Sequence, residues 1–135
     1  MGSFTDTLEN ALLDHVFRNT AYTQAATVYS ALFTVIPSDS TGGTEVTQAS
    51  SGYTRVATTF VTAGLTSTGR TSNSGAVNFA TVAGGATITV VGWGIMSAAT
   101  AGAGTLIAWA TVTSTVLNVG DQATFPAANI VLTLD

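Results

Sequence analysis

The feature that most constrains this chain is a run of fifty residues, Thr71 to Gly120, without one ionisable side chain. General acid–base and nucleophilic catalysis need titratable groups held close together. More than a third of the 135-residue chain therefore cannot contribute to either kind of catalysis. The run is instead rich in Thr, Val, Ala and Gly and contains both Trp residues. This composition is typical of pleated sheets and packed surfaces.

The whole chain is similarly poor in charge. Only 7% of its residues are charged, none is lysine, and 46% are hydrophobic, whereas a soluble domain usually carries about a quarter charged residues. The net charge of −4 gives only modest self-repulsion. We interpret the surface as largely committed to other protein, and predict a homo-oligomer, with a trimer as its order. The length predicts a single domain, residues 1–135, able to bury roughly 68% of its unfolded surface.

The N-terminal segment predicts an α-helix from Thr5 to Phe17. Ser3 with Asp6, and Asp6 with Glu9, have the spacing of a capping box. Apolar residues then recur at steps of three and four, and Asn19 suits a left-handed cap. The stripe and the basic residue at the helix end form a candidate interface: Leu8, Leu12, His15, Val16 and Arg18.

The remainder of the chain predicts seven or eight strands separated by turns. Their expected ranges are Thr27 to Val35, Tyr53 to Val61, Val77 to Phe79, Thr87 to Met96, Thr105 to Thr113, Gln122 to Phe125 and Ile130 to Leu134. This count favours a mainly β fold, an antiparallel sandwich resembling a jelly roll with one N-terminal helix. The helix takes about residues 5–17 and the sandwich about 27–135. Polar loops at Ser38 to Thr44 and Thr66 to Ser74 are predicted contact loops.

The strand at Thr87 to Met96 carries an alternation that predicts close packing. Trp93 and Ile95 lie on one face, and Gly92 and Gly94 lie on the other. Glycine inside a strand often marks a close approach by another element. We therefore expect backbone or an aromatic ring to lie over the glycine face.

A membrane span is the alternative interpretation of the uncharged segment from Ile88 to Val112. A spanning helix needs about 20 mainly apolar residues with Lys or Arg anchors. This segment has Thr at strand spacing, several Gly and no flanking basic residue. Two strands and a turn explain it better, so no membrane partner is expected. The N-terminal segment also lacks the basic and apolar regions of a signal peptide.

Enzymatic and nucleic-acid functions find little support. His15 is the sole histidine, cysteine is absent, and no G-x-S-x-G or lysine-containing phosphate loop occurs. Asp6 and Glu9 are explained by capping. Three arginines in a chain of pI near 4.4 do not make a nucleic-acid surface. We predict no enzyme, no catalytic residue, no cofactor, no metal and no nucleic-acid partner.

Aromatic residues are the remaining candidates for ligand contact. Trp93 and Trp109 could stack on sugars on a β-sandwich, and core packing is the alternative account of both. The candidate surface-binding set is Tyr53, Arg55, Trp93 and Trp109.

Several segments resemble a family of small tailed-bacteriophage virion proteins that are commonly labelled tail-fibre-like. In the first half the resemblance lies in Leu8 to His15, Ala21-Tyr22-Thr23, Val28 to Thr34, Gly43 to Val46 and Gly52 to Arg55. In the second half it lies in Gly92 to Ile95, Leu106 to Trp109, Asn118 to Asp121, Phe125-Pro126-Ala127 and Ile130 to Asp135. The chain departs from the family near Ala25-Ala26, where an expected proline is absent.

The resemblance implies a non-enzymatic virion structural protein. Our leading hypothesis is a multi-copy accessory or decoration protein on the capsid or tail surface. The alternative is a receptor- or glycan-binding tail-fibre module for host adsorption. The expected partners are other virion proteins and further copies of the chain, with a host receptor or glycan under the alternative. The expected location is the virion, assembled in the host cytoplasm.

Overall fold

The computed structural model describes residues 3–47, 51–65, 67–85 and 87–134. The fold is mainly β, with antiparallel sheets and an N-terminal helix, as the sequence predicts. The elements in chain order are β1 (Ser3–Phe4), α1 (Asp6–Phe17), β2 (Val28–Val35), β3 (Thr44–Glu45), β4 (Val56–Thr58), β5 (Arg70–Ser72), β6 (Val77–Asn78), β7 (Ile88–Met96), β8 (Leu106–Leu117), β9 (Thr124–Phe125) and β10 (Val131–Thr133).

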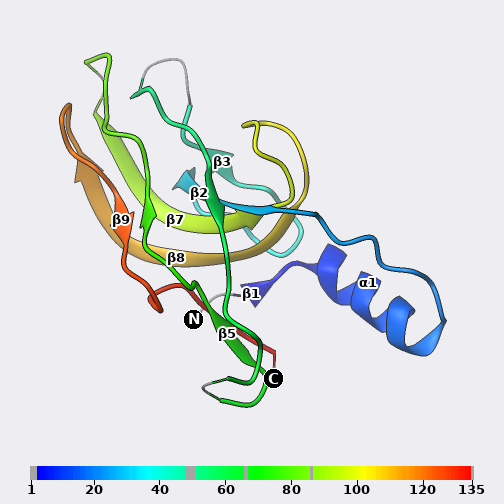
Figure 1. The fold of residues 1–135 in the computed structure, drawn as a ribbon. Helices are drawn as coiled ribbons and strands as arrows, with labels where there is room; N and C mark the ends of the chain where they lie inside the picture. The colour runs from blue at the N-terminus through cyan, green and yellow to red at the C-terminus, as the bar shows by residue number, and fades with distance from the viewer. Residues whose placement is uncertain (1–2, 48–50, 66, 86, 135) are drawn as a thin grey trace.

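A curved principal sheet forms the larger layer of the molecule (Figure 1). Its strand order is β1-β8-β7-β2-β3, and β4 also pairs with β2. Two short ribbons, β5–β10 and β6–β9, supply side chains to the same core as this sheet. Trp93 and Ile95 of β7 share a core with Val77, Phe79 and Ile130 from the second layer. The second layer thus covers one face of the principal sheet.

The glycines of β7 lie under close neighbours, as the alternation predicts. A Cβ atom at Gly94 would lie 3.0 Å from Cε2 of Phe33 and 2.7 Å from Cδ1 of Leu106. One at Gly92 would lie 3.2 Å from the carbonyl oxygen of Ala110. Phe33, Leu106, Ala31 and Met96 form a second, smaller apolar cluster there, against which Trp109 packs. Both faces of β7 are therefore covered within the chain.

Several strand boundaries differ from the predicted ones. Arg70–Ser72 forms β5 inside a predicted loop, because it pairs with β10 although its residues are polar; Thr66 of that loop lies outside the described residues. β1 and β3 are two-residue strands without a sequence signal. β4 is shorter than predicted, whereas β8 extends to Leu117 through its pairing with β7.

The segment from Ile88 to Val112 forms β7, a turn and the first part of β8, as predicted. Among the described residues, no helix is long and apolar enough to cross a membrane.

The N-cap of helix α1 is Thr5, whereas the two predicted capping boxes begin at Ser3 and at Asp6. Ser3 and Phe4 pair with Trp109 and Ala108 of β8, so Thr5 is the first residue free to cap the helix. The Thr5 hydroxyl accepts a hydrogen bond from the Leu8 N–H and donates one to the Leu106 carbonyl. At the other end Asn19 adopts the predicted left-handed conformation, with φ of 54°.

The glycine face yields a stability prediction. Gly94→Ala should lower the free energy of unfolding by about 1–3 kcal/mol, since overpacking strains a filled site. Leu106 could shift aside, but the Ala108 carbonyl, 3.1 Å from the new Cβ, belongs to the paired β8 backbone. Denaturant midpoints measure the effect. Gly75→Ala is the matched control, because its Cβ would meet nothing within 4 Å, and should change stability by less than about 0.5 kcal/mol. Equal midpoints for the two variants would contradict close packing.

Candidate functional site

Three of the four residues predicted to bind at the surface are buried. Tyr53, Trp93 and Arg55 expose only 4%, 6% and 7% of their surface. Trp93 packs edge-on against Phe125 in the core, with ring centroids 6.5 Å apart. The prediction of these residues as surface contacts is therefore wrong for the folded chain, and the core-packing alternative describes Trp93. Strand alternation alone could not distinguish a surface position from a core position for Trp93, because both faces of β7 are covered.

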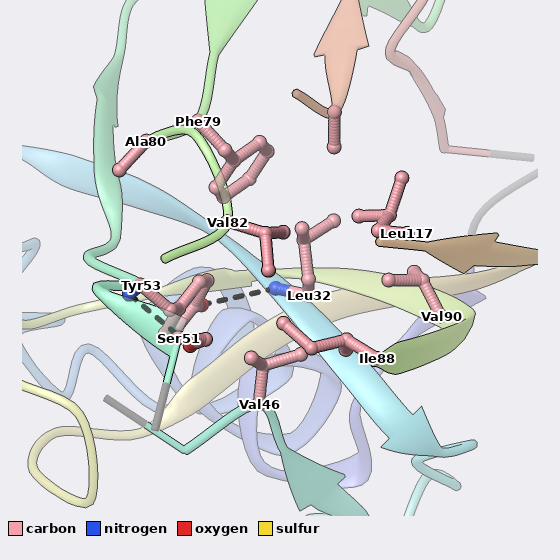
Figure 2. Close-up of a pocket in the computed structure, with 11 residues that line it drawn as sticks. Leu32, Val46, Ser51, Tyr53, Phe79, Ala80, Val82, Ile88, Val90 and Leu117 are labelled. Carbon is pink, nitrogen blue, oxygen red and sulfur yellow. Dashed lines mark hydrogen bonds between the residues drawn. The ribbon is translucent and has the colours of Figure 1, made fainter. Parts of the chain in front are cut away.

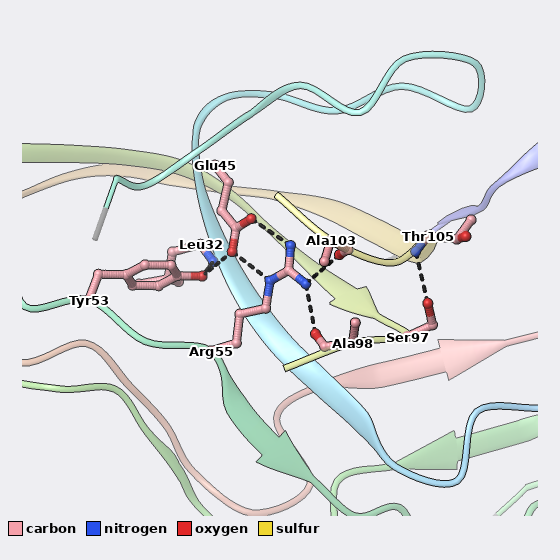
Figure 3. A network of polar contacts seen from close by, with 8 residues as sticks. All are labelled: Leu32, Glu45, Tyr53, Arg55, Ser97, Ala98, Ala103 and Thr105. Atoms are coloured by element: carbon pink, nitrogen blue, oxygen red, sulfur yellow. Dashed lines mark hydrogen bonds and ion pairs between the residues drawn. The ribbon is translucent and has the colours of Figure 1, made fainter. Parts of the chain in front are cut away.

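Arg55 is the centre of a buried polar network that joins distant parts of the chain (Figure 3). Its Nε donates to Oε1 of Glu45 and its Nη2 donates to Oε2, both at 2.7 Å. Its Nη1 donates to the carbonyl oxygens of Ala98 and Ala103, at 2.7 and 2.8 Å. Such a two-point arginine–carboxylate contact fixes geometry as well as charge.

Tyr53 completes this network from the same segment as Arg55. Its hydroxyl donates to Oε1 of Glu45 at 2.8 Å and accepts the backbone N–H of Leu32 at 3.0 Å. Burial raises the pKa of the Tyr53 hydroxyl well above its ordinary value, and the Glu45 carboxylate adds to the rise. The ring itself stacks on Phe79, with centroids 6.0 Å apart.

We call Glu45, Tyr53 and Arg55 the clamp. It ties β2 and β3 to the loop between β7 and β8, because Arg55 binds two carbonyls of that loop. Every polar side-chain atom buried in the described part of the chain has a hydrogen-bond partner. The clamp is therefore a structural device with its charges satisfied. The spacing of Tyr53 and Arg55, which puts both on one face of an extended segment, was the available sequence signal for it.

Trp109 is the one predicted surface residue that stays partly exposed. Its Nε1 donates to Oδ1 of Asp39 at 3.0 Å. Asp39 also lines an open polar groove of about 250 Å³ between the loop at 38–42, the first turn of α1 and the start of β8. The other polar side chains of the groove are hydroxyls: Thr5, Thr7, Ser38, Ser40, Thr41 and Thr105. The groove thus offers many hydrogen-bonding groups and one carboxylate.

The interior cavity drawn in Figure 2 has a different character. Core side chains including Leu32, Phe79 and Val90 surround it, and it holds only about 10 Å³. A space of this size is at the lower limit for a single water molecule. It is a packing void and offers no room for a ligand.

The predicted interface residues of α1 differ in environment. Leu8 and Leu12 are half-buried, whereas His15, Val16 and Arg18 are exposed. Nδ1 of His15 accepts the backbone N–H of Tyr22 at 3.4 Å, which closes the turn after the helix. The structure also exposes Leu13 and Phe17, which the predicted stripe omitted. The interface itself stays a prediction.

Across the described ranges, His, Asp and Glu residues form no group of three that could hold a metal ion.

The clamp yields a prediction about buried charge. Glu45→Ala leaves the Arg55 guanidinium buried without its carboxylate, and removing one partner of a buried pair costs about 3–5 kcal/mol. We expect the denaturant midpoint to fall accordingly. Asp14→Ala is the control, because it breaks the exposed Asp14–Arg18 pair of 3.1 Å, which contributes about 0–1 kcal/mol. If Glu45→Ala is as stable as Asp14→Ala, the clamp does not hold the fold.

The raised pKa of Tyr53 predicts alkaline unfolding. A group whose pKa is higher in the folded than in the unfolded state stabilises the fold below its unfolded pKa, about 10 for Tyr. That contribution is lost as the pH rises further. Stability of the native protein should fall above about pH 10, and Tyr53 should ionise only on unfolding, as followed by tyrosinate absorbance. In Tyr53→Phe this component of the alkaline loss should vanish; an unchanged pH profile would contradict the assignment.

Comparison with known proteins places the chain in a family. No curated protein matches it. The family model described as podophage GP4 fiber I protein gp80 matches residues 3–133. The match leaves out only two residues at each end and includes β1, α1, the clamp and every strand described above. The chain therefore belongs to the podophage GP4 fiber I protein gp80 family, a family of phage tail-fibre proteins.

Proposed function

We propose that this protein is a non-enzymatic structural subunit of a podophage tail fibre, present in several copies in the virion. The observation that carries the proposal is the fibre-family match along residues 3–133. It favours the fibre hypothesis over our leading sequence-based hypothesis of a decoration protein, because the family description names a fibre and no decoration role.

The packing and the surface of the chain support a structural role. β7 is buried from Gly92 to Met96, and the clamp fixes the loop that follows it. Such a body is closely packed, and large exposed apolar side chains remain on its surface for contacts with other protein. We propose other copies of this chain and further virion proteins as partners, with a trimer as the expected order.

A second candidate function is recognition of a host surface glycan during adsorption. The observation that favours it is the hydroxyl-lined groove beside Asp39, whose carboxylate Trp109 holds through its indole N–H. Neutral sugars are bound by side chains that can both donate and accept hydrogen bonds. The groove has no cationic side chain among its lining residues, so it suits a neutral saccharide better than an anionic one.

The fibre assignment predicts where the protein is found. Gold-labelled antibody against the purified chain should bind the tail region of intact particles, and particles grown without the chain should lack a class of fibre. The measurement is electron microscopy of both particle types, with antibody against the major capsid protein as the labelling control. Label over the head alone would return the decoration hypothesis to first place.

The glycan candidate predicts a separable loss of adsorption. Asp39→Asn keeps the size of the side chain and removes its charge at an exposed position, so folding should be unchanged within about 0.5 kcal/mol. If the groove binds sugar, adsorption of variant phage to host cells should fall at least tenfold. Glu9→Gln, at an exposed acid outside the lining residues, is the matched control. Normal adsorption of Asp39→Asn would remove the groove from consideration.

A further inference from the structure

Helix α1 is an arm that the rest of the chain covers only in part. None of its twelve residues is buried, and Figure 1 shows it extending to one side of the curved sheet. An isolated helix of fewer than about 12–15 residues is marginal in water, since most helical stability in proteins comes from packing. The fold anchors α1 at its first turn, where Thr5 bonds the Leu106 and Ile107 carbonyls. Its far end gains no such support.

The far end of the arm carries an apolar knob, which we define as Leu13, Val16 and Phe17. Spacings of three and four residues put these side chains on one helix face. All three are exposed, and Phe17 exposes 78% of its surface. Arg18 follows directly and is also exposed.

The opposite side of the molecule has an apolar socket. This open pocket of about 270 Å³ lies between the C-terminal half of β8 and β9. Leu32 and Val90 lie buried at its base, half-buried Val112, Ala123 and Phe125 line it, and exposed Thr115 lies at its rim. Figure 1 shows β9 and the end of β8 on the side of the sheet away from α1. One chain therefore cannot put its own knob into its own socket.

We propose that the knob of one copy inserts into the socket of the next copy. The sizes are compatible, because a cavity of about 150 Å³ already accommodates benzene and the socket is larger. The charges are compatible too: Arg18 flanks the knob, and exposed Asp121 directly precedes the socket residue Gln122. Among the described residues Arg18 pairs with Asp14 across an exposed contact, and an exposed pair of this kind exchanges partners at little cost.

This contact joins two different surfaces and is therefore heterologous. Heterologous contacts close into rings when the rotation between copies permits and otherwise extend as filaments. The inference rests on the proposed function, since it specifies how copies of a fibre subunit associate. It accounts for a partly uncovered helix and an open apolar pocket with a single interaction.

Two single-site variants test the contact in the full chain. Phe17→Ser removes the knob and leaves the socket, while Thr115→Arg blocks the rim of the socket and leaves the knob. Both positions are exposed, so both variants should fold with native thermal midpoints. Leu65→Ser is the control, because Leu65 is 70% exposed and lies on neither surface.

Analytical ultracentrifugation should find the native chain and Leu65→Ser associated, and each of the other variants alone monomeric. An equal mixture of Phe17→Ser and Thr115→Arg should form a one-to-one dimer, because the intact knob of one fits the intact socket of the other. Retained association of either variant alone, or a mixture that stays monomeric, overturns the proposal. Labelling of the tail by antibody is unaffected by these outcomes, so loss of the contact and loss of the fibre assignment are distinguishable.

A cross-link distinguishes this contact from pairing of two α1 helices. The native chain has no cysteine, so a cysteine introduced at Arg18, beside the knob, or at Asp121, beside the socket, is the only thiol in its chain and leaves the apolar residues of the contact unchanged. Disulfide-linked dimer should form in the mixture of Arg18→Cys and Asp121→Cys and be absent from either alone. Cross-linking of Arg18→Cys alone would show helix–helix pairing and refute the socket as the partner.

Discussion

The buried guanidinium of Arg55 is the group on which most of the arrangement depends. A charge taken out of water must find hydrogen bonds for its N–H groups or destabilise the fold. Four N–H contacts of Arg55 reach Glu45 of β3 and Ala98 and Ala103 of the loop between β7 and β8, so with its own segment Arg55 joins three segments. Because Arg55 is buried, the three segments cannot separate without exposing an unpaired charge to an apolar interior. A chain with only ten charged residues thus uses one of them to fix its topology.

The loop that Arg55 holds also affects the position of helix α1. The loop that Arg55 holds leads directly into β8, whose Leu106 and Ile107 carbonyls bind Thr5. Thr5 is the N-cap of α1, so the direction in which the helix leaves the sheet is set by β8. Leu106 also lies over Gly94, which links the same residue to the glycine face of β7. The clamp, the smaller apolar cluster and helix α1 therefore all contact the same hairpin, β7–β8.

The origin of the uncharged run is largely internal. We expected a surface largely committed to other protein, but β7 from Gly92 to Met96 is buried within the chain, with Trp93 in the larger core and Met96 in the smaller cluster. A charge on either face would be desolvated before any partner arrived. Large exposed apolar side chains are found instead at other positions, such as Phe17 and Val116.

Sequence periodicity predicted the elements whose pattern is long and regular. α1, β2 and β7 lie within about two residues of their expected bounds, since each combines strong periodicity with clear end signals. β5 escaped prediction because its residues, Arg70 to Ser72, are polar, and a strand made by pairing with distant β10 leaves no local pattern. Among site residues, exposure could not be predicted, because Tyr53 and Arg55 alternate like a half-exposed strand. Tertiary contacts bury them: Tyr53 stacks on Phe79, and Arg55 binds Glu45 and the loop between β7 and β8.

In the proposed contact, the residues that bind the next copy are not the residues that hold the fold. The residues that hold the fold, such as Arg55 and Trp93, lie inside the body, whereas the knob residues are largely exposed. Folding free energy and association free energy then depend on different side chains, so each can vary without the other. Thr5 binds β8, and Leu8, Ala11 and Leu12 of α1 are half-buried, whereas Leu13, Val16 and Phe17 are exposed. In the proposed contact the far half of α1 would pack against the next copy, and any free energy spent in ordering that half would reduce the net affinity.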